Sequence, residues 1–275
     1  MSTNINNDIN SGQSILLEAV SVNKVLRLTL NDSKRRNALS EEMMTLLSSA
    51  LDRASNNKDV KVIIISANGP AFCSGHDLKQ MSAGRKNDDD GLSYFTHVFS
   101  SCSALMQQIV NHPKPLIAEV SGVAAAAGCQ LVACCDLAIA AESSRFVTPG
   151  VNIGLFCSTP MVALSRNVSN KAAMEMLLTG EMIDSQRAEQ IGLVNRVVED
   201  AALGQQTLKM ASLIASKSSM ALETGKKAFY SQKDMPLSEA YEYASKVMVD
   251  NMLKQDAKEG INAFIEKRQP KWQDK

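Results

Sequence analysis

The stretch Gly122-Val-Ala-Ala-Ala-Ala-Gly-Cys-Gln-Leu-Val-Ala-Cys-Cys-Asp136 decides the fold prediction, because its small residues join a strand to a helix. The preceding residues 114–121 form a short apolar run that is typical of a buried strand. Alanine is the best helix former, so we expect a helix to begin near Ala126 or Ala127. The first N–H groups of such a helix lack partners and lie at the positive end of its dipole. The stretch therefore fits either a site for a negatively charged oxygen or a tightly packed core helix.

A second stretch has the same design. Residues 61–67 are apolar and read as a buried strand, and they lead into Asn68-Gly-Pro-Ala-Phe-Cys-Ser-Gly-His-Asp-Leu-Lys79. Here again a strand ends in a turn that contains glycine and exposes backbone N–H groups. Two such turns can present two amides to one carbonyl oxygen, which is the arrangement of an oxyanion hole.

These two stretches together carry a resemblance to a known family. Phe72-Cys-Ser-Gly-His-Asp-Leu-Lys79, followed by the Gly122 stretch, resembles the enoyl-CoA hydratase/isomerase (crotonase) superfamily. Arg36-Asn-Ala-Leu-Ser40 looks like its early CoA-contacting loop, and residues 259–268 look like its C-terminal signature. Residues 123–130 and 148–160 look most like the enoyl-CoA hydratase domain-containing subgroup. Four motifs in the family's order extend the resemblance over most of the chain.

The resemblance implies an α/β fold, a spiral of β-β-α units followed by a C-terminal helical trimerisation region. Strand, turn and helix patterns repeat through residues 60–200, and only helical patterns follow from about residue 201. Without the resemblance, these patterns predict only an α/β part followed by helices. We expect a flexible tail at 1–12, a crotonase-like core at 13–200 and a helical region at 201–275.

The resemblance also implies roles for particular residues. The backbone amides of His76 and Ala127 match the two donors that hold a thioester carbonyl in the family. The residues that match CoA contacts are Arg36, Asn37, Ala38, Phe264 and Lys267. Of these, Phe264 and Lys267 match residues that reach a neighbouring subunit's CoA, although a core phenylalanine and a solvated lysine remain alternatives. Lys227 is a weaker candidate for a phosphate contact.

The chain departs from the family pattern at the catalytic carboxylates. Hydratases of this family carry one glutamate where this chain has Gln130, and another where it has Gly150. Hydration needs a base for water and an acid for carbon, and neither glutamine nor glycine can transfer a proton near neutral pH. The ionisable side chains left near the two turns are Cys73, His76, Asp77, Glu119 and Glu142, with His76 the strongest candidate for a replacement.

Three functions are compatible with these observations. The first is an enzyme of the hydratase or isomerase type that acts on an acyl- or enoyl-CoA, as in fatty acid metabolism, with poor ordinary hydratase activity. The second is a non-catalytic or weakly active acyl-CoA-binding protein, and the third is a scaffold without a ligand. In the first two, coenzyme A enters as part of the ligand and no separate cofactor is expected.

The composition limits which binding partners and which cellular compartment we expect. Lys+Arg and Asp+Glu both number 29, a balance that argues against nucleic acid as a partner and provides no polybasic membrane anchor. Six cysteines lack zinc-site spacing and only three histidines occur, so we expect no metal site. No apolar run reaches membrane-spanning length. The polar, arginine-free start of the chain resembles no targeting signal, which predicts a cytoplasmic protein. The family resemblance predicts a homotrimer or a dimer of trimers.

Overall fold

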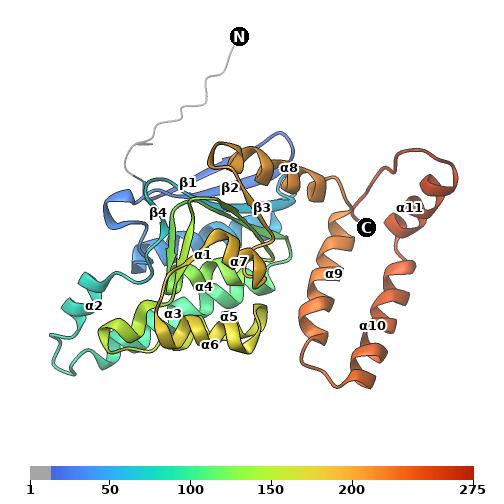
Figure 1. The fold of residues 1–275 in the computed structure, drawn as a ribbon. Helices are drawn as coiled ribbons and strands as arrows, with labels where there is room; N and C mark the ends of the chain where they lie inside the picture. The colour runs from blue at the N-terminus through green and yellow to red at the C-terminus, as the bar shows by residue number, and fades with distance from the viewer. Residues whose placement is uncertain (1–13) are drawn as a thin grey trace, which may run out of the picture.

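The computed structural model describes residues 14–275 (Figure 1), so the tail expected at residues 1–12 lies outside the described range. A six-stranded sheet forms the centre of the described chain, in the order β1-β2-β3-β5-β7-β10. Its strands are β1 (Leu16–Val20), β2 (Val25–Leu30), β3 (Val62–Ala67), β5 (Leu116–Val120), β7 (Leu137–Ala141) and β10 (Arg196–Val198). All neighbouring pairs are parallel except β1 and β2. The apolar runs expected as buried strands are β3 and β5, whose residues are almost all buried because helices cover both faces.

A second, smaller sheet lies beside the first, in the order β4-β6-β8-β9. Its strands are β4 (Ala71–Cys73), β6 (Val123–Ala125), β8 (Arg145–Val147) and β9 (Ile183–Asp184). Three of them follow directly on strands of the large sheet: β4 follows β3, β6 follows β5, and β8 follows β7. Helices then return the chain to the next long strand. The predicted α/β fold of repeated β-β-α units is confirmed.

The helices of the core are amphipathic or wholly buried. They are α1 (Glu41–Asn56), α2 (Leu78–Gly84), α3 (Leu92–Asn111), α4 (Ala127–Cys134), α5 (Ser158–Asn167), α6 (Asn170–Thr179), α7 (Ser185–Gln190) and α8 (Leu203–Ala215). Ser40 caps α1 by accepting from the amide of Met43, as serine does at helix starts. Every residue of α4 is buried, since it lies between the small sheet, α3 and α5. On the other face of the large sheet, α8 packs its alanines against Val62, Ile64 and Ile117.

The last three helices, α9 (Ser219–Gln232), α10 (Leu237–Met252) and α11 (Gln255–Ile265), extend away from both sheets (Figure 1). No residue of α9 or α10 is buried. Large apolar side chains are exposed here, among them Leu237 at 75%, Leu253 at 80% and Phe264 at 85%. Within residues 14–275, no helix combines the length and the apolar character needed to cross a bilayer.

Candidate functional site

Three turns that are far apart in the sequence meet at one edge of the small sheet. Strands β4, β6 and β8 are parallel neighbours, with Cys73 opposite Ala124 and Ala125 opposite Val147. Parallel strands end at the same edge of a sheet, so the segments that follow them lie side by side. These segments are residues 74–76 after β4, residues 126–127 after β6, and residues 148–150 after β8.

The first two turns touch each other through their backbones. Gly75 has φ +88°, and a Cβ added to it would lie 3.0 Å from the Ala125 carbonyl oxygen and 3.3 Å from the Ala127 nitrogen. A Cβ at Gly128 would lie 2.1 Å from the carbonyl oxygen of Cys73. Only glycine permits this close approach of α4 to β4, which explains the small residues in both stretches.

The turn before α4 has unusual backbone geometry. Ala126 has φ 49° and ψ −117°, a region that residues other than glycine rarely occupy. Two hydrogen bonds hold it there: its N–H donates to Val147 at 2.9 Å, and its carbonyl accepts from the Gln130 amide at 3.1 Å. As a result α4 begins at Ala127, the residue at which the alanine-rich stretch predicted a helix start. Strain of this kind is common at functional sites.

The amides of His76 and Ala127 have no backbone acceptor among residues 14–275. Both lie at the edge that the two turns share, and the Ala127 amide also lies at the positive end of the α4 dipole. Two N–H donors side by side suit a carbonyl oxygen that gains negative charge. The structure therefore brings together the two donors singled out in the sequence.

Neither of the two positions expected to carry carboxylates offers an acid or a base. Gln130, one turn into α4, is only 4% exposed, and its Oε1 has no hydrogen-bond partner within residues 14–275. Gly150 lies in a 3₁₀ turn at Pro149–Ile153. A Cβ there would lie 2.9 Å from the Cys157 sulfur and 3.0 Å from the Leu155 carbonyl oxygen. The space next to Gly150 is filled by the protein itself.

Four of the remaining ionisable candidates have other roles or lie elsewhere. Burial raises the pKa of the Cys73 thiol to about 12, which keeps it protonated. Asp77 caps α2, accepting from the amides of Lys79 and Gln80 at 2.9 and 3.3 Å. Glu119 lies on the large sheet and pairs with Arg27, and Glu142 is exposed. None of them is a free acid or base at the shared edge.

The His76 imidazole is half-buried and packs edge-on against Phe99, with ring centroids 5.4 Å apart. Neither of its ring nitrogens has a hydrogen-bond partner in the described chain. Burial lowers the pKa of His76, against a smaller opposing effect of the Leu39 carbonyl. The ring is therefore neutral at pH 7, and its hydrogen-bonding capacity is unused.

The early loop expected to contact CoA lies beside the Gly75 turn. The Arg36 carbonyl accepts from the Ser74 amide at 3.1 Å, and the Leu39 amide donates to Gly75 at 2.8 Å. Asn37 is fully buried, and its side chain donates to the carbonyls of Asn68 and Ala71.

The Asn37 side chain therefore braces the loop, and Ala38 is buried too, which leaves Arg36 exposed. By contrast, Phe264 and Lys267 belong to the C-terminal end of the chain, well away from this loop (Figure 1). Within one chain, the structure does not bring these two residues to the shared edge.

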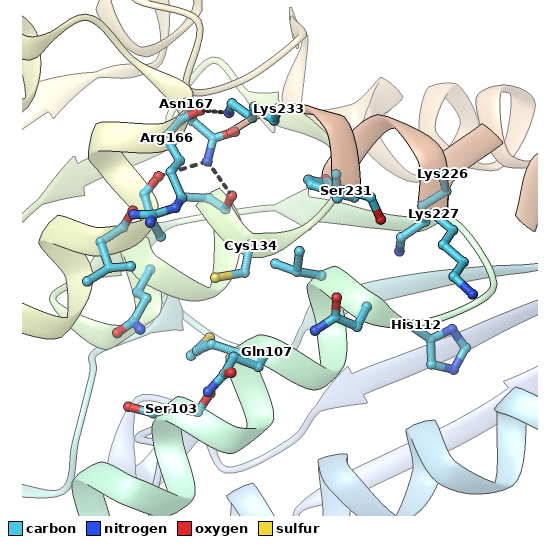
Figure 2. A pocket seen from close by; sticks show the side chains of 18 of the residues that line it. Ser103, Gln107, His112, Cys134, Arg166, Asn167, Lys226, Lys227, Ser231 and Lys233 are labelled. Carbon is cyan, nitrogen blue, oxygen red and sulfur yellow. Dashed lines mark hydrogen bonds between the residues drawn. The ribbon is translucent and has the colours of Figure 1, made fainter. Parts of the chain in front are cut away.

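A cavity of about 830 Å³ lies between α3, α4, α5 and α9 (Figure 2). Gln130 and Cys134 line it from α4, and Met106 and Val110 line it from α3. Residues 127, 130 and 134 share one face of a helix because they are spaced by three and four. The cavity therefore begins one helical turn from the Ala127 amide.

A buried ion pair fastens α9 over this cavity. The Lys226 ammonium donates to Asp136 Oδ2 at 2.7 Å and to the carbonyls of Ile109 and Lys114 at 3.2 Å. The Tyr230 hydroxyl donates to Asp136 Oδ1 at 3.0 Å. Burial lowers the pKa of Lys226, and Asp136 opposes this effect. We call this set of contacts the α9 clasp. Asp136 thus has a structural role, and nothing local in the sequence marks Lys226.

Residues 14–275 contain no group of three or more His, Cys, Asp or Glu side chains that could hold a metal ion. Comparison with known proteins decides the family. Residues 21–275 match the family model described as enoyl-CoA hydratase/isomerase. The chain belongs to the enoyl-CoA hydratase/isomerase, or crotonase, family.

Individual members of the family are similar over most of their length. The human protein named enoyl-CoA hydratase domain-containing protein 3, mitochondrial, is 49% identical over 248 residues, covering 90% of this chain and 80% of that protein. The crystal structure of human enoyl coenzyme A hydratase domain-containing protein 3 has a TM-score of 0.89 at 46% identity, covering 94% of this chain and 100% of that one. The structure of an enoyl-CoA hydratase from Mycobacterium smegmatis has a TM-score of 0.90 at 45% identity, covering 94% of this chain and 99% of that one. The resemblance to the domain-containing subgroup is confirmed.

The predicted cytoplasmic location is contradicted by these relatives. The human, rat and mouse proteins, each 49% identical to this chain, are all named mitochondrial. The prediction rested on the composition of the first residues of the chain. A targeting segment has no part in the packed fold, so similarity across the fold can persist while this segment varies.

Proposed function

We propose that this crotonase-family protein binds an acyl- or enoyl-CoA thioester and polarises its carbonyl between the amides of His76 and Ala127. The observation that carries the proposal is the meeting of these two free donors at one edge of the small sheet. Removing one donor from an oxyanion hole typically costs on the order of 100- to 1000-fold in rate. A preserved pair of donors therefore supports thioester chemistry of the hydratase or isomerase type.

The nucleotide part and the acyl part of the ligand would bind in different places. The loop at Arg36 adjoins the Gly75 turn, and the cavity is lined by Gln130, one helical turn after Ala127. Arg36 is the exposed cation of that loop, so it is our candidate for a phosphate contact, with Asn37 holding the loop in shape.

Infrared spectroscopy of a thioester with a ¹³C-labelled carbonyl tests the proposal directly. On binding, the carbonyl stretch should move to lower frequency, since hydrogen bonds from two amides weaken the C=O bond. Calorimetry with butyryl-CoA, octanoyl-CoA and free CoA gives the affinities in parallel. Absence of binding by all thioesters, or binding with an unshifted carbonyl band, would refute the proposal.

A non-catalytic or weakly active acyl-CoA-binding protein is the second candidate. It is favoured by Gln130, which cannot exchange a proton, and by the filled space at Gly150. The two candidates separate in one assay, in which pure protein is mixed with crotonyl-CoA and the products are identified by mass spectrometry. Turnover supports the enzyme, whereas binding without turnover supports the binder.

We also propose that the protein assembles as a homotrimer or a dimer of trimers. The support is the set of large apolar side chains exposed on the C-terminal helices, with Phe264 on α11 among the most exposed. Neither Phe264 nor Lys267 reaches the amides of its own chain, so a role at CoA requires a second copy. A monomeric mass in light scattering would contradict both the assembly and that role.

A further inference from the structure

The cavity under α9 combines apolar surface with polar and charged side chains. Ligand pockets in proteins are mostly apolar with a few polar groups, and a hydrocarbon chain gains most from such walls. Apolar atoms make up most of the surface of this cavity, and polar and charged side chains supply the rest. Ser103 and Gln107 line one wall, and charged residues of α5 and α9 line the opposite side (Figure 2).

The charged residues leave an excess of positive charge. Four cations line the cavity, namely Arg166, Lys226, Lys227 and Lys233, against two carboxylates, Glu223 and Asp234. Asp136 neutralises Lys226 within the α9 clasp.

The other three cations have no ion-pair partner among residues 14–275. The Lys233 ammonium donates to the Arg166 carbonyl, so these two residues lie together at one end (Figure 2). Glu223 lies one turn before Lys227 on α9 and offsets part of its charge.

The position of the cavity links it to the acyl group. It begins at Gln130 and continues along α4 to Cys134, about 10 Å along the helix axis from Ala127 at 1.5 Å per residue. The loop at Arg36 adjoins the Gly75 turn and does not line this cavity. A thioester held by the amides, with its nucleotide on that loop, would direct its acyl group into the cavity.

We propose that this cavity selects acyl groups that end in a carboxylate, so that dicarboxylic acyl-CoA thioesters are the preferred ligands. The inference rests on the proposed thioester binding and adds the substrate class. Lys227 and Arg166 are the specificity-determining residues, because both are cations that line the cavity. The apolar surface receives the methylene chain, and the cations bind its carboxylate end.

The test compares two thioesters of equal chain length, pentanoyl-CoA and glutaryl-CoA, by calorimetry at low ionic strength. Glutaryl-CoA should bind about fivefold more tightly, since contacts between partly solvated charges each contribute little. Arg166→Met should reduce this preference while leaving the affinity for pentanoyl-CoA and free CoA unchanged, and Lys227→Met should reduce the preference as well. Raised salt should weaken the preference as well, because these cations are exposed.

Lys246→Met is the matched control, since Lys246 is an exposed lysine of α10 outside the cavity, and it should change no affinity. Equal binding of the two thioesters, or tighter binding of pentanoyl-CoA, would overturn the carboxylate selectivity and leave thioester binding intact. Weaker binding of free CoA to Lys227→Met would assign that cation to a phosphate and would also overturn the inference. Failure of both thioesters to bind would overturn the proposed function with it.

Discussion

The edge of the small sheet and the C-terminal helices are held in place by different kinds of contact. At the edge, backbone packs on backbone, and a Cβ at Gly128 would lie 2.1 Å from the Cys73 oxygen. In α9, a Cβ at Gly225 would meet no atom within 4 Å, and no residue of the helix is buried. The α9 clasp, centred on Asp136, supplies much of the contact between this helix and the core.

The difference separates two requirements of the proposed function. Two amides must be held in fixed positions to stabilise charge on one oxygen, and dense backbone packing provides this. A cavity wall that selects an acyl group tolerates more variation, since its side chains act through charge and hydrogen bonds. Changes at the edge should therefore weaken the binding of all thioesters alike, whereas changes in α9 should alter which thioester is preferred.

Removal of the clasp carboxylate should have the largest effect. Asp136→Ala leaves the Lys226 ammonium, whose side chain is only 7% exposed, without its partner, and it also deprives the Tyr230 hydroxyl and the Leu116 amide of an acceptor. We expect a loss of about 3 kcal/mol or more in the free energy of unfolding, measured by urea denaturation. Glu175→Ala removes a partner from an exposed ion pair and should cost less than about 1 kcal/mol. Equal losses would show that α9 does not depend on the clasp.

A pair of glycine substitutions contrasts the two regions directly. Gly128→Ala should destabilise the protein by about 2–3 kcal/mol, because neither backbone can move away without disturbing the amides, and acyl-CoA binding should be lost with it. Gly225→Ala should stabilise it by about 0.5–1 kcal/mol, since alanine is the better helix former and has free space. Thermal unfolding and calorimetry measure both. Normal acyl-CoA binding by Gly128→Ala would contradict the tight packing of the edge.

Introducing a carboxylate at position 130 should show whether the edge of the small sheet can support hydration. Gln130→Glu replaces a buried amide whose Oε1 has no partner with a group that can transfer a proton, so hydration of crotonyl-CoA should rise about 100-fold over wild type. Loss of enoyl-thioester absorbance measures the rate, with Gln130→Met as the inactive control. Gly150→Glu is not a suitable companion, since Cys157 and Leu155 occupy its space. Rapid hydration by the wild type would instead show that another residue transfers the proton, with the His76 ring as the first candidate.

The smallest predicted effect is the pH dependence of stability that arises from His112, at the junction between the core and α9. His112 is buried, and its ring nitrogens lie 3.1 Å from the Leu51 carbonyl and 3.3 Å from that of Lys114. Burial lowers its pKa from 6.5, with Lys226 and Lys114 adding to the effect and the two carbonyls opposing it. The unfolded chain therefore binds more protons below this pH, and stability falls as the pH drops through and below 6.5.

Replacing this histidine should flatten the pH dependence. Between about pH 7 and pH 5, the free energy of unfolding of His112→Gln should fall by about 1 kcal/mol less than that of the wild type, measured by urea denaturation at each pH. A steeper slope in His112→Gln would mean that the protonated ring is the form stabilised by folding.

The sequence alone determined much of the local structure, and it predicted which acid and base groups of related hydratases this chain lacks. The start of α4 at Ala127, the cap at Ser40 and the buried strand β3 depend on residues a few positions apart, which is the range over which propensity, capping and periodicity act. The resemblance to the family also predicted that Gln130 and Gly150 stand where related hydratases carry glutamates. These predictions needed no knowledge of how the elements pack.

The tertiary structure decided what those elements do together. That β4 and β6 are parallel neighbours, so that the His76 and Ala127 amides share one edge, depends on strand order, which local patterns do not encode. The α9 clasp joins Lys226 to a carbonyl 117 positions earlier in the chain, and only packing brings them together. Asn37 was likewise predicted to contact the ligand, whereas in the structure its buried side chain donates hydrogen bonds to the carbonyls of Asn68 and Ala71 and so connects two distant turns. Contacts between distant residues arise from the simultaneous packing of many side chains, whereas periodicity and capping describe only the nearest neighbours.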